Sequence, residues 1–430
     1  MTKPLHSFFT FLAVCCLAGS AMAQEGIIKS SVLPTKPGKT YSVPTYAAEA
    51  ISLKCEDCVI DKAYFVVGQD TVTVNQDGHV DMSALVFLPS KQETITFYSG
   101  TINADLQMVY ITGTPKKPIA KKTITLRTDN SDCAIQVVPP SVWRTGLIQP
   151  NYTPGFSTTN VIAVHHGDSP NTAPTYEEGL RVLRSYYNHH TSPSGNNWSD
   201  IGYNYLIGPD GTIFLGREKL ASQTGTGQES DKIIAAHLCA KNTNTMGICL
   251  IGRYTSEMPT AKTLESLYKL IKWKAAKDNI DLNSKVLHPV NPTSSQTQAL
   301  IPRLIGHREG PCGTSCPGDF FYNNHFINPN SPVRPILNEV GNICAAPLGL
   351  TNEDMNYIVV VYPNPTNGQE LKANFDYKTV SVYGLDGKQV RAAVKKAGEV
   401  LPVTGLTAGT YLFHFDTPDY GKVVRRVVVN

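Results

Sequence analysis

The stretch YNYLIGPDGTIFLGR, residues 203–217, places two apolar runs on either side of a Pro-Asp-Gly sequence. Pro209, Asp210 and Gly211 are residue types that favour tight turns, so this stretch predicts a β-hairpin. This hairpin is the element of the region that the sequence predicts most clearly, so the neighbouring segments are described relative to it.

The segments around this hairpin alternate between predicted strands and predicted helices. VIAVHH (161–166) and TMGICLIG (245–252) are short apolar runs typical of buried strands. YEEGLRVLRSYYNHH (176–190) and TAKTLESLYKLIKWKAAKD (260–278) carry apolar residues at helical spacing, with Thr260 or Thr263 as N-cap of the second helix. Strands that alternate with helices predict an α/β domain, which we place at residues 131–345.

The rest of the chain divides into segments of different composition. Short β-branched and aromatic runs separated by turn residues predict a small β-sandwich before the α/β domain and a compact β-module after it. No chemistry-bearing motif is visible in the first, so we expect a spacer or a binding accessory. The predicted organisation is a signal peptide (1–23), an extended leader (24–48), a β-rich accessory domain (49–130), the α/β domain (131–345), a linker (346–357) and a C-terminal β-domain (358–430).

Composition and charge restrict the class of protein. The chain has 430 residues, of which 41% are hydrophobic and 17% charged, and its formal net charge is +3. This near-neutral balance argues against a nucleic-acid partner. Lys3, the apolar run FFTFLAVCCLAG (8–19) and Ala21-Met22-Ala23 form a secretory signal pattern. No later run is long and apolar enough for a transmembrane segment, so we expect an exported, soluble monomer.

Export determines how the ten cysteines are interpreted. Cys15 and Cys16 leave with the signal peptide, and an oxidising compartment favours disulfides among the other eight. The Cys55-x-x-Cys58 pair predicts a local disulfide or free thiols, because no second pair follows at the spacing of a zinc ribbon. The states of Cys239 and Cys249 stay open.

One histidine at a strand end and a later His-Cys loop raise the possibility of a metal site. His165 ends a predicted strand, and His307 and Cys316 lie in GHREGPCGTSCPGDF (306–320), a loop rich in Gly and Pro. Three such ligands and one open position for water describe a hydrolytic zinc site. The competing interpretation is two buried histidines and a disulfide that joins Cys312 to Cys316 or to Cys344.

Five motifs in order resemble one known family. Residues 155–330 are similar to the zinc N-acetylmuramoyl-L-alanine amidase family, which includes the peptidoglycan recognition proteins. The motifs are VPPSVWRTGL (138–147), which precedes this range and resembles the entry segment of the family, and VIAVHHG (161–167), WSDIGYNYLIGPDGTIFLGRE (198–218), AAHLCAKNTNTMGICLIGRY (235–254) and GHRE with TSCPG (306–318) within it. The resemblance implies a central mixed β-sheet flanked by helices.

The resemblance also implies the roles of site residues. His165, His307 and Cys316 match the zinc ligands, Tyr203 matches the catalytic tyrosine, and Thr314 matches a position held by threonine or lysine. The implied reaction is hydrolysis of the amide between N-acetylmuramic acid and L-alanine of the stem peptide, by a zinc-bound water that Tyr203 orients. Thr314 would donate a hydrogen bond to the tetrahedral oxyanion.

The expected substrate contacts are His190, His237 and Asn242. His237 and Asn242 lie in the segment that resembles the groove of the family. His190 ends a predicted helix, where a favourable interaction with the helix dipole is an alternative explanation. His166 follows His165 and points to the opposite face of the strand, so we expect it to pack rather than to bind metal.

Two departures from the family pattern stand out. One extra residue separates His307 from Cys316, and a polar, Pro-rich insertion (284–300) precedes the last predicted strand of the domain. We expect this insertion on the surface near the groove. With Cys316 assigned to zinc, Cys312 becomes a surplus thiol, and we expect Cys344 as its partner.

The C-terminal β-domain resembles the sorting domain of type IX secretion. YPNPTNG (362–368), VYGLDGKQV (382–390), LTAGTYLFHF (406–415) and the final GKVVRRVVVN carry this resemblance. It implies the type IX secretion machinery as a partner, and release or surface attachment after export; an ordinary carbohydrate-binding domain is the alternative. The sequence thus predicts a secreted zinc amidase acting on peptidoglycan or muropeptides, with a non-catalytic muropeptide-binding protein as the alternative.

Overall fold

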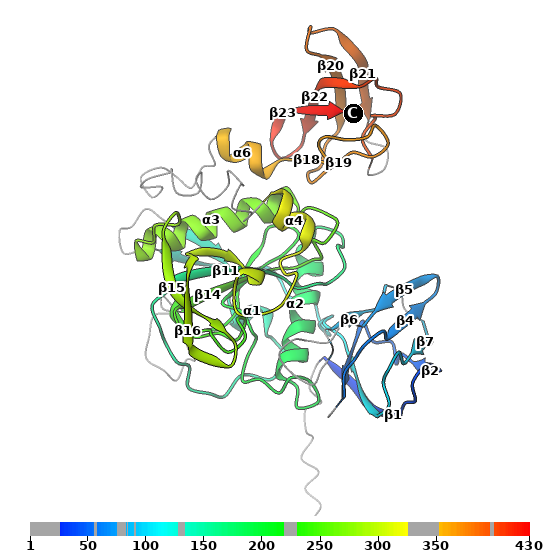
Figure 1. The fold of residues 1–430 in the computed structure, drawn as a ribbon, viewed down its shortest axis with the longest axis vertical. Coiled ribbons are helices and arrows are strands. Elements are labelled where there is room, and N and C mark those ends of the chain that lie inside the picture. The colour runs from blue at the N-terminus through cyan, green and yellow to red at the C-terminus, as the bar shows by residue number, and fades with distance from the viewer. Residues whose placement is uncertain are drawn as a thin grey trace, which may run out of the picture.

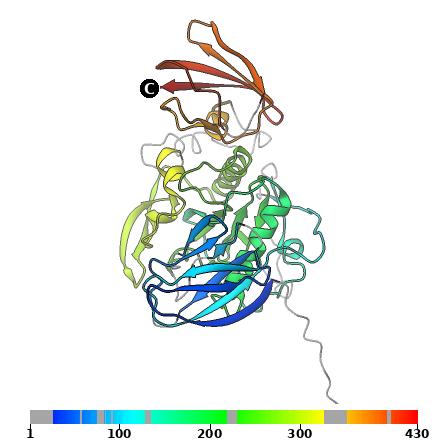
Figure 2. The ribbon, with the colours of Figure 1, turned by 90° about the vertical axis from the view of Figure 1, so that its right-hand side faces the viewer.

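The computed structural model describes residues 26–55, 58–74, 83, 85–89, 92–127, 134–218, 230–325, 352–395 and 400–430. Figure 1 shows an N-terminal β-domain beside a central α/β domain, with a C-terminal β-module beyond helix α3. The view in Figure 2, turned by 90°, shows the N-terminal sheets in front of the α/β domain and the C-terminal module above it. The predicted signal peptide lies outside the described residues. Among the helices described, none has the length and apolar character needed to cross a membrane.

The N-terminal domain consists of two antiparallel four-stranded sheets. Alternating side chains such as Leu53, Phe65, Phe97 and Met108 form its core between the sheets. The Cys55–Cys58 disulfide is present. The sheets are β1 (Ile27–Pro34), β8 (Asp105–Ile111), β3 (Ala50–Lys54) and β6 (Val86–Phe87), and β2 (Thr40–Pro44), β7 (Thr94–Tyr98), β4 (Tyr64–Val67) and β5 (Asp70–Thr73).

The predicted leader at 24–48 is wrong for the residues that the structure describes. β1 pairs with β8 and β2 pairs with β7, so this segment supplies an edge strand to each sheet of the sandwich. The prediction failed because the edge strands are rich in Lys, Ser, Thr and Pro, a composition that edge strands tolerate and that also marks loops. A small antiparallel pair, β9 (Ile124–Arg127) and β10 (Ala134–Val137), then leads into the α/β domain.

The α/β domain is built on a five-stranded sheet in the order β13-β12-β14-β11-β17. The strands β12, β14, β11 and β17 run parallel, and β13 returns antiparallel to β12, so the mixed sheet and the hairpin are confirmed. At the hairpin turn, Asp210 Oδ1 accepts the N–H of Thr212 at 3.0 Å, and Gly211 has a φ of +81°. The strands are β11 (Val161–His166), β12 (Tyr205–Ile207), β13 (Ile213–Leu215), β14 (Thr245–Leu250) and β17 (Leu304–Gly306).

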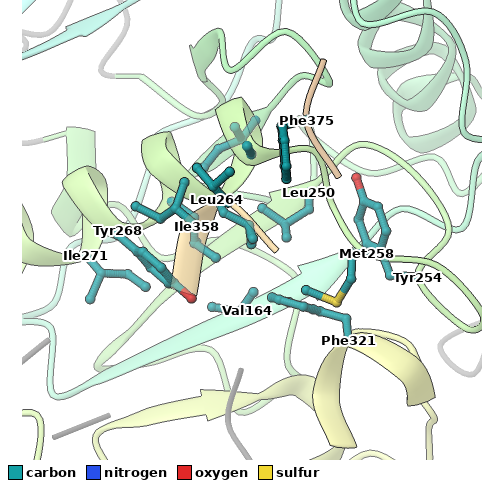
Figure 3. Close-up of a cluster of buried hydrophobic side chains, with 14 of the residues drawn as sticks. Val164, Leu250, Tyr254, Met258, Leu264, Tyr268, Ile271, Phe321, Ile358 and Phe375 are labelled. Carbon is teal, nitrogen blue, oxygen red and sulfur yellow. The ribbon is translucent and has the colours of Figure 1, made fainter. Parts of the chain in front are cut away.

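Two long helices cover the two faces of this sheet. Helix α3 (Ala261–Asp278) packs on one face, where Val164 and Leu250 meet Leu264 and Ile271 (Figure 3). Helix α2 (Tyr176–Thr191) packs on the other face through Leu180 and Leu183. Thr175 caps α2 and Thr260 caps α3, each accepting a backbone N–H three residues later. The short elements of the domain are α1 (Pro140–Trp143), η1 (Ser230–Lys232), η2 (His307–Glu309) and α4 (Asp319–Asn324).

The insertion at 284–300 forms an antiparallel hairpin, β15 (Lys285–Asn291) with β16 (Ser294–Pro302). As expected it lies at the surface, with Leu287 and Leu300 more than half exposed. One side of the hairpin contacts the loop that follows η1: the His288 ring bonds Lys241 O at 3.2 Å, and Lys241 Nζ bonds Ser295 Oγ at 3.1 Å.

The C-terminal module is a four-stranded antiparallel sheet in the order β21-β20-β22-β23, joined to a short β18-β19 pair. It begins with helix α6 (Asn352–Ile358), so the predicted linker is helical from Asn352 onward; residues 346–351 lie outside the described part. Asn374 connects the module to α3, because its backbone C=O accepts the Ala261 N–H at 2.8 Å. The strands are β18 (Val361–Tyr362), β19 (Lys372–Ala373), β20 (Thr379–Gly384), β21 (Gln389–Lys395), β22 (Gly409–Thr417) and β23 (Gly421–Val429).

Candidate metal and catalytic site

The three predicted metal ligands meet at one edge of the central sheet. β11 and β17 are parallel neighbours, so His165 at the end of β11 and His307 just after β17 lie at the same edge. The loop after η2 brings Cys316 to them. All three side chains are buried, with exposed fractions of 1%, 9% and 7%. One ring nitrogen of each histidine and the Cys316 sulfur lie within 4.8 Å of one another.

The environment of Cys316 suits a thiolate that binds a cation. Its Sγ lies 3.9 Å from Nδ1 of His165 and accepts the backbone N–H of His166 at 3.3 Å. Burial raises the pKa of the Cys316 thiol to about 12, so this group carries a proton at neutral pH until a metal displaces it. Two buried imidazoles and one buried thiol are a donor set that zinc prefers, with a fourth position left for water. The residues present therefore fit a zinc ion.

His166 supports this site from the side. Its Nδ1 accepts the backbone N–H of Tyr254 at 3.2 Å, and burial lowers the pKa of its ring to about 4. The ring is therefore neutral at physiological pH and occupied as an acceptor, which agrees with the expected packing role.

Tyr203 and Thr314 border the same cavity as the three ligands, and this cavity has a volume of about 560 Å³. Tyr203 lies just before β12, and its ring centroid is 5.3 Å from that of His165. The Thr314 hydroxyl oxygen accepts the backbone N–H of Cys316 at 3.1 Å, which orders the turn before the ligand. Both side chains are half-buried. The arrangement places a phenol and a hydroxyl beside the potential metal position.

The three predicted substrate contacts occupy different environments. His190 lines the cavity at the end of α2, where its ring stacks on Trp198 at a centroid distance of 4.8 Å. His237 also borders the cavity, but it lies behind His165 with only 2% of its surface exposed. Asn242 is absent from the described cavity lining, and its Oδ1 accepts the backbone N–H groups of His237 and Leu238, each at 2.8 Å. Its amide thus orders the loop that carries His237.

The disulfide at this site differs from the prediction. Cys312 pairs with Cys239, and Cys344 lies outside the described residues. The expected Cys312–Cys344 bridge is wrong because the fold brings the loop after His237 against the loop after His307, and the Leu238 side chain fills the space next to Gly310. This contact joins segments that are 73 residues apart, and the spacing of the cysteines along the chain contains no signal for it. Cys249 stays a buried free thiol in β14.

The contribution of the N-terminal domain to the cavity was not predicted from the sequence. Leu85, just before β6, lines the same cavity as the metal ligands. The next strand packs on α2, where the Phe87 ring meets Tyr186 edge to face at 5.9 Å; Figure 1 shows β6 beside α2. The domain is further held by Arg184, whose Nε donates to Gly113 O at 3.0 Å, and by the Arg181–Glu49 ion pair at 3.3 Å. Leu85 reaches the site only through this docking.

Comparisons with known proteins find two families in this chain. Residues 155–319 match the N-acetylmuramoyl-L-alanine amidase family, and residues 360–430 match the secretion system C-terminal sorting domain. Peptidoglycan-recognition protein LB of Drosophila melanogaster is 27% identical over 197 residues, which cover 43% of this chain and 71% of the relative. The N-acetylmuramoyl-L-alanine amidase of Homo sapiens is 26% identical over 162 residues, 37% of this chain.

The matches to several relatives are partial. This chain spans 22% of the length of the human amidase and 50% of the endolysin of Enterobacteria phage T3, to which it is 30% identical over 96 residues. Among solved structures, wild-type Drosophila PGRP-LB is 25% identical and covers 43% of this chain and 89% of its own, with a TM-score of 0.32. The sorting domain indicates export by a secretion system. The chain therefore carries a domain of the N-acetylmuramoyl-L-alanine amidase family, followed by a secretion system C-terminal sorting domain.

Proposed function

We propose that this protein is a secreted zinc-dependent amidase that hydrolyses the bond between N-acetylmuramic acid and L-alanine in peptidoglycan. The observation that supports this most strongly is the buried convergence of His165, His307 and Cys316, with ligand atoms within 4.8 Å of one another, beside Tyr203 in one cavity. The family match supplies the substrate class.

The residues divide the chemistry among them. His165, His307 and Cys316 would hold the ion, and zinc, when bound, polarises the scissile carbonyl and lowers the pKa of a coordinated water. Tyr203 would orient the attacking water through its hydroxyl, since an ordinary phenol pKa of about 10 makes it a poor base at neutral pH. The Thr314 oxygen already accepts the Cys316 N–H, so its own proton can be donated to the oxyanion that develops.

Export is the second part of the proposal. The N-terminal signal pattern would direct the chain across the inner membrane, and the sorting domain would then engage the type IX secretion machinery. The target would be peptidoglycan or muropeptides outside the cytoplasm. After export the enzyme would be released or attached to the cell surface.

A non-catalytic muropeptide-binding protein is the alternative function, since peptidoglycan recognition proteins are among the relatives. A binding protein needs a groove but needs neither a metal thiolate nor a phenol at the metal position. Cys316 and Tyr203 are both present and directed to one cavity, which favours hydrolysis.

The test is cleavage of defined muropeptides by the purified, zinc-loaded protein, followed by mass spectrometry of the products. The proposal expects free stem peptide from the wild type and none from Cys316→Ala. Cys55→Ala/Cys58→Ala is the control, because it removes two cysteines of the N-terminal domain that form their own disulfide and are not among the proposed ligands. Zinc-dependent binding of the muropeptide with no release of stem peptide would establish the alternative.

A further inference from the structure

A chain of hydrogen bonds runs from the candidate metal ligand His165 into the interior of the domain. His165 Nε2 lies 3.0 Å from His237 Nδ1, and His237 Nε2 lies 3.1 Å from the Thr245 hydroxyl oxygen. The Thr245 hydroxyl in turn donates to the backbone C=O of Asn242 at 2.7 Å. The side chains of His165, His237 and Thr245, which form this series of hydrogen bonds, are all buried, with exposed fractions of 3% or less.

The donor and acceptor of each hydrogen bond in this series follow from the last bond, between the Thr245 hydroxyl and the Asn242 carbonyl. A hydroxyl has one proton, and a carbonyl oxygen can only accept, so the Thr245 proton is used on Asn242 O. Thr245 Oγ1 must therefore accept from His237 Nε2–H. A neutral His237 protonated at Nε2 has a lone pair on Nδ1, which accepts the proton of His165 Nε2. His165 is then left with its lone pair on Nδ1, the nitrogen that faces Cys316.

The His237 ring is also fixed in position by its surroundings. Its backbone N–H donates to the Asn242 side chain at 2.8 Å, so the loop that carries it is ordered. Gly247 of β14 lies directly against the ring, where an added Cβ would be 2.5 Å from His237 Cγ. The ring thus occupies space that only a glycine leaves, and it cannot turn toward the cavity without breaking its contacts on both sides.

We infer that His237 and Thr245 are positioning residues, which fix the tautomer and orientation of His165 so that its Nδ1 lone pair points at the metal. This inference rests on the proposed zinc site and assigns His237 a role behind the ligand in place of the predicted contact with substrate. Partners of this kind, which hold the second nitrogen of a metal-bound histidine, raise its basicity and fix its ring.

The test uses the full-length protein and removes the hydrogen bond that lies farthest from the metal position, between His237 and Thr245. Thr245→Val keeps the shape of the side chain but removes the acceptor for His237 Nε2–H, whereas Thr245→Ser keeps the hydroxyl and serves as the matched control. Zinc affinity is measured by competition with a chelating dye. The d–d and thiolate charge-transfer bands of the cobalt-substituted protein report the ligand geometry. The melting temperature of the metal-free protein reports stability.

The inference expects Thr245→Val to weaken zinc binding by about tenfold to a hundredfold and to shift the cobalt bands, with Thr245→Ser close to the wild type. His237→Asn, whose Oδ1 lies where Nδ1 of the ring lies and can accept from His165, should retain more affinity than His237→Ala. Wild-type zinc affinity and cobalt bands in Thr245→Val would overturn the inference, even if its metal-free form melts earlier. Zinc affinity and the cobalt bands do not depend on whether an amide is cleaved. Failure of the proposed function would be seen separately, as a zinc-loaded wild-type protein without amidase activity.

Discussion

Removal of the Cys239–Cys312 disulfide should destabilise the α/β domain far more than removal of the Cys55–Cys58 disulfide. The first bond joins residues 73 positions apart, and the second joins residues 3 positions apart. In the chain-entropy model the longer loop constrains the unfolded chain by about 15 cal/mol/K, which corresponds to about 4 kcal/mol at 25 °C. The same relation gives the short loop about 2 kcal/mol, as an upper bound, because short loops deviate from it.

The assay is urea unfolding of the Cys239→Ser/Cys312→Ser variant, followed by tryptophan fluorescence. The three tryptophans of the chain, Trp143, Trp198 and Trp273, all lie in the α/β domain, so the signal reports on the domain that holds this disulfide. Cys55→Ser/Cys58→Ser is the control, because its disulfide lies in the other domain. A loss of less than about 1 kcal/mol in the Cys239/Cys312 variant, at an unchanged m-value, would refute the argument from loop length.

Three further predictions follow from the site. Tyr203→Phe should lower kcat by about a hundredfold with unchanged zinc affinity, because only the hydroxyl that orients the water is lost; a kcat equal to that of the wild type would contradict this role. Leu85→Asp should raise KM for muropeptides while kcat and zinc content stay unchanged, because Leu85 lines the cavity. Val59→Asp is the control on the same domain: this residue is 67% exposed, and its replacement should change neither KM nor kcat. Equal KM values in the two variants would contradict a contact between Leu85 and the substrate. Because burial raises the pKa of the Cys316 thiol to about 12, zinc must displace its proton, so apparent zinc affinity should fall about tenfold for each pH unit lowered below neutrality; titration with a zinc-binding dye that shows a pH-independent affinity would contradict this.

The parts of the fold that sequence reasoning predicted are those with strong local signals. The Pro209-Asp210-Gly211 turn, the buried strand that carries His165 and the helix capped by Thr260 each depend on a few neighbouring residues. Parallel strands bring their carboxyl ends to one end of the sheet, which places His165 and His307 together, as the resemblance of the motifs to the amidase family implied.

The parts that sequence reasoning missed depend on contacts between distant segments. The Cys239–Cys312 bond arises from two loops that pack together only in the folded domain. Leu85 belongs to a domain with no recognisable site, and it reaches the cavity because Phe87 and Glu49 dock on α2. The position of His237 behind His165 requires the space beside Gly247, which a motif cannot indicate.

The most direct measurement of the central claim is hydrolysis of a defined muropeptide by the zinc-loaded protein in water labelled with heavy oxygen. Amide hydrolysis at the proposed bond places the labelled oxygen on the lactyl carboxylate of N-acetylmuramic acid and releases an unlabelled stem peptide with a free L-alanine amine. We predict this pattern for the wild type, and no product after the metal is removed with a chelator. Label found on the stem peptide, or no product from the zinc-loaded protein, would contradict the account.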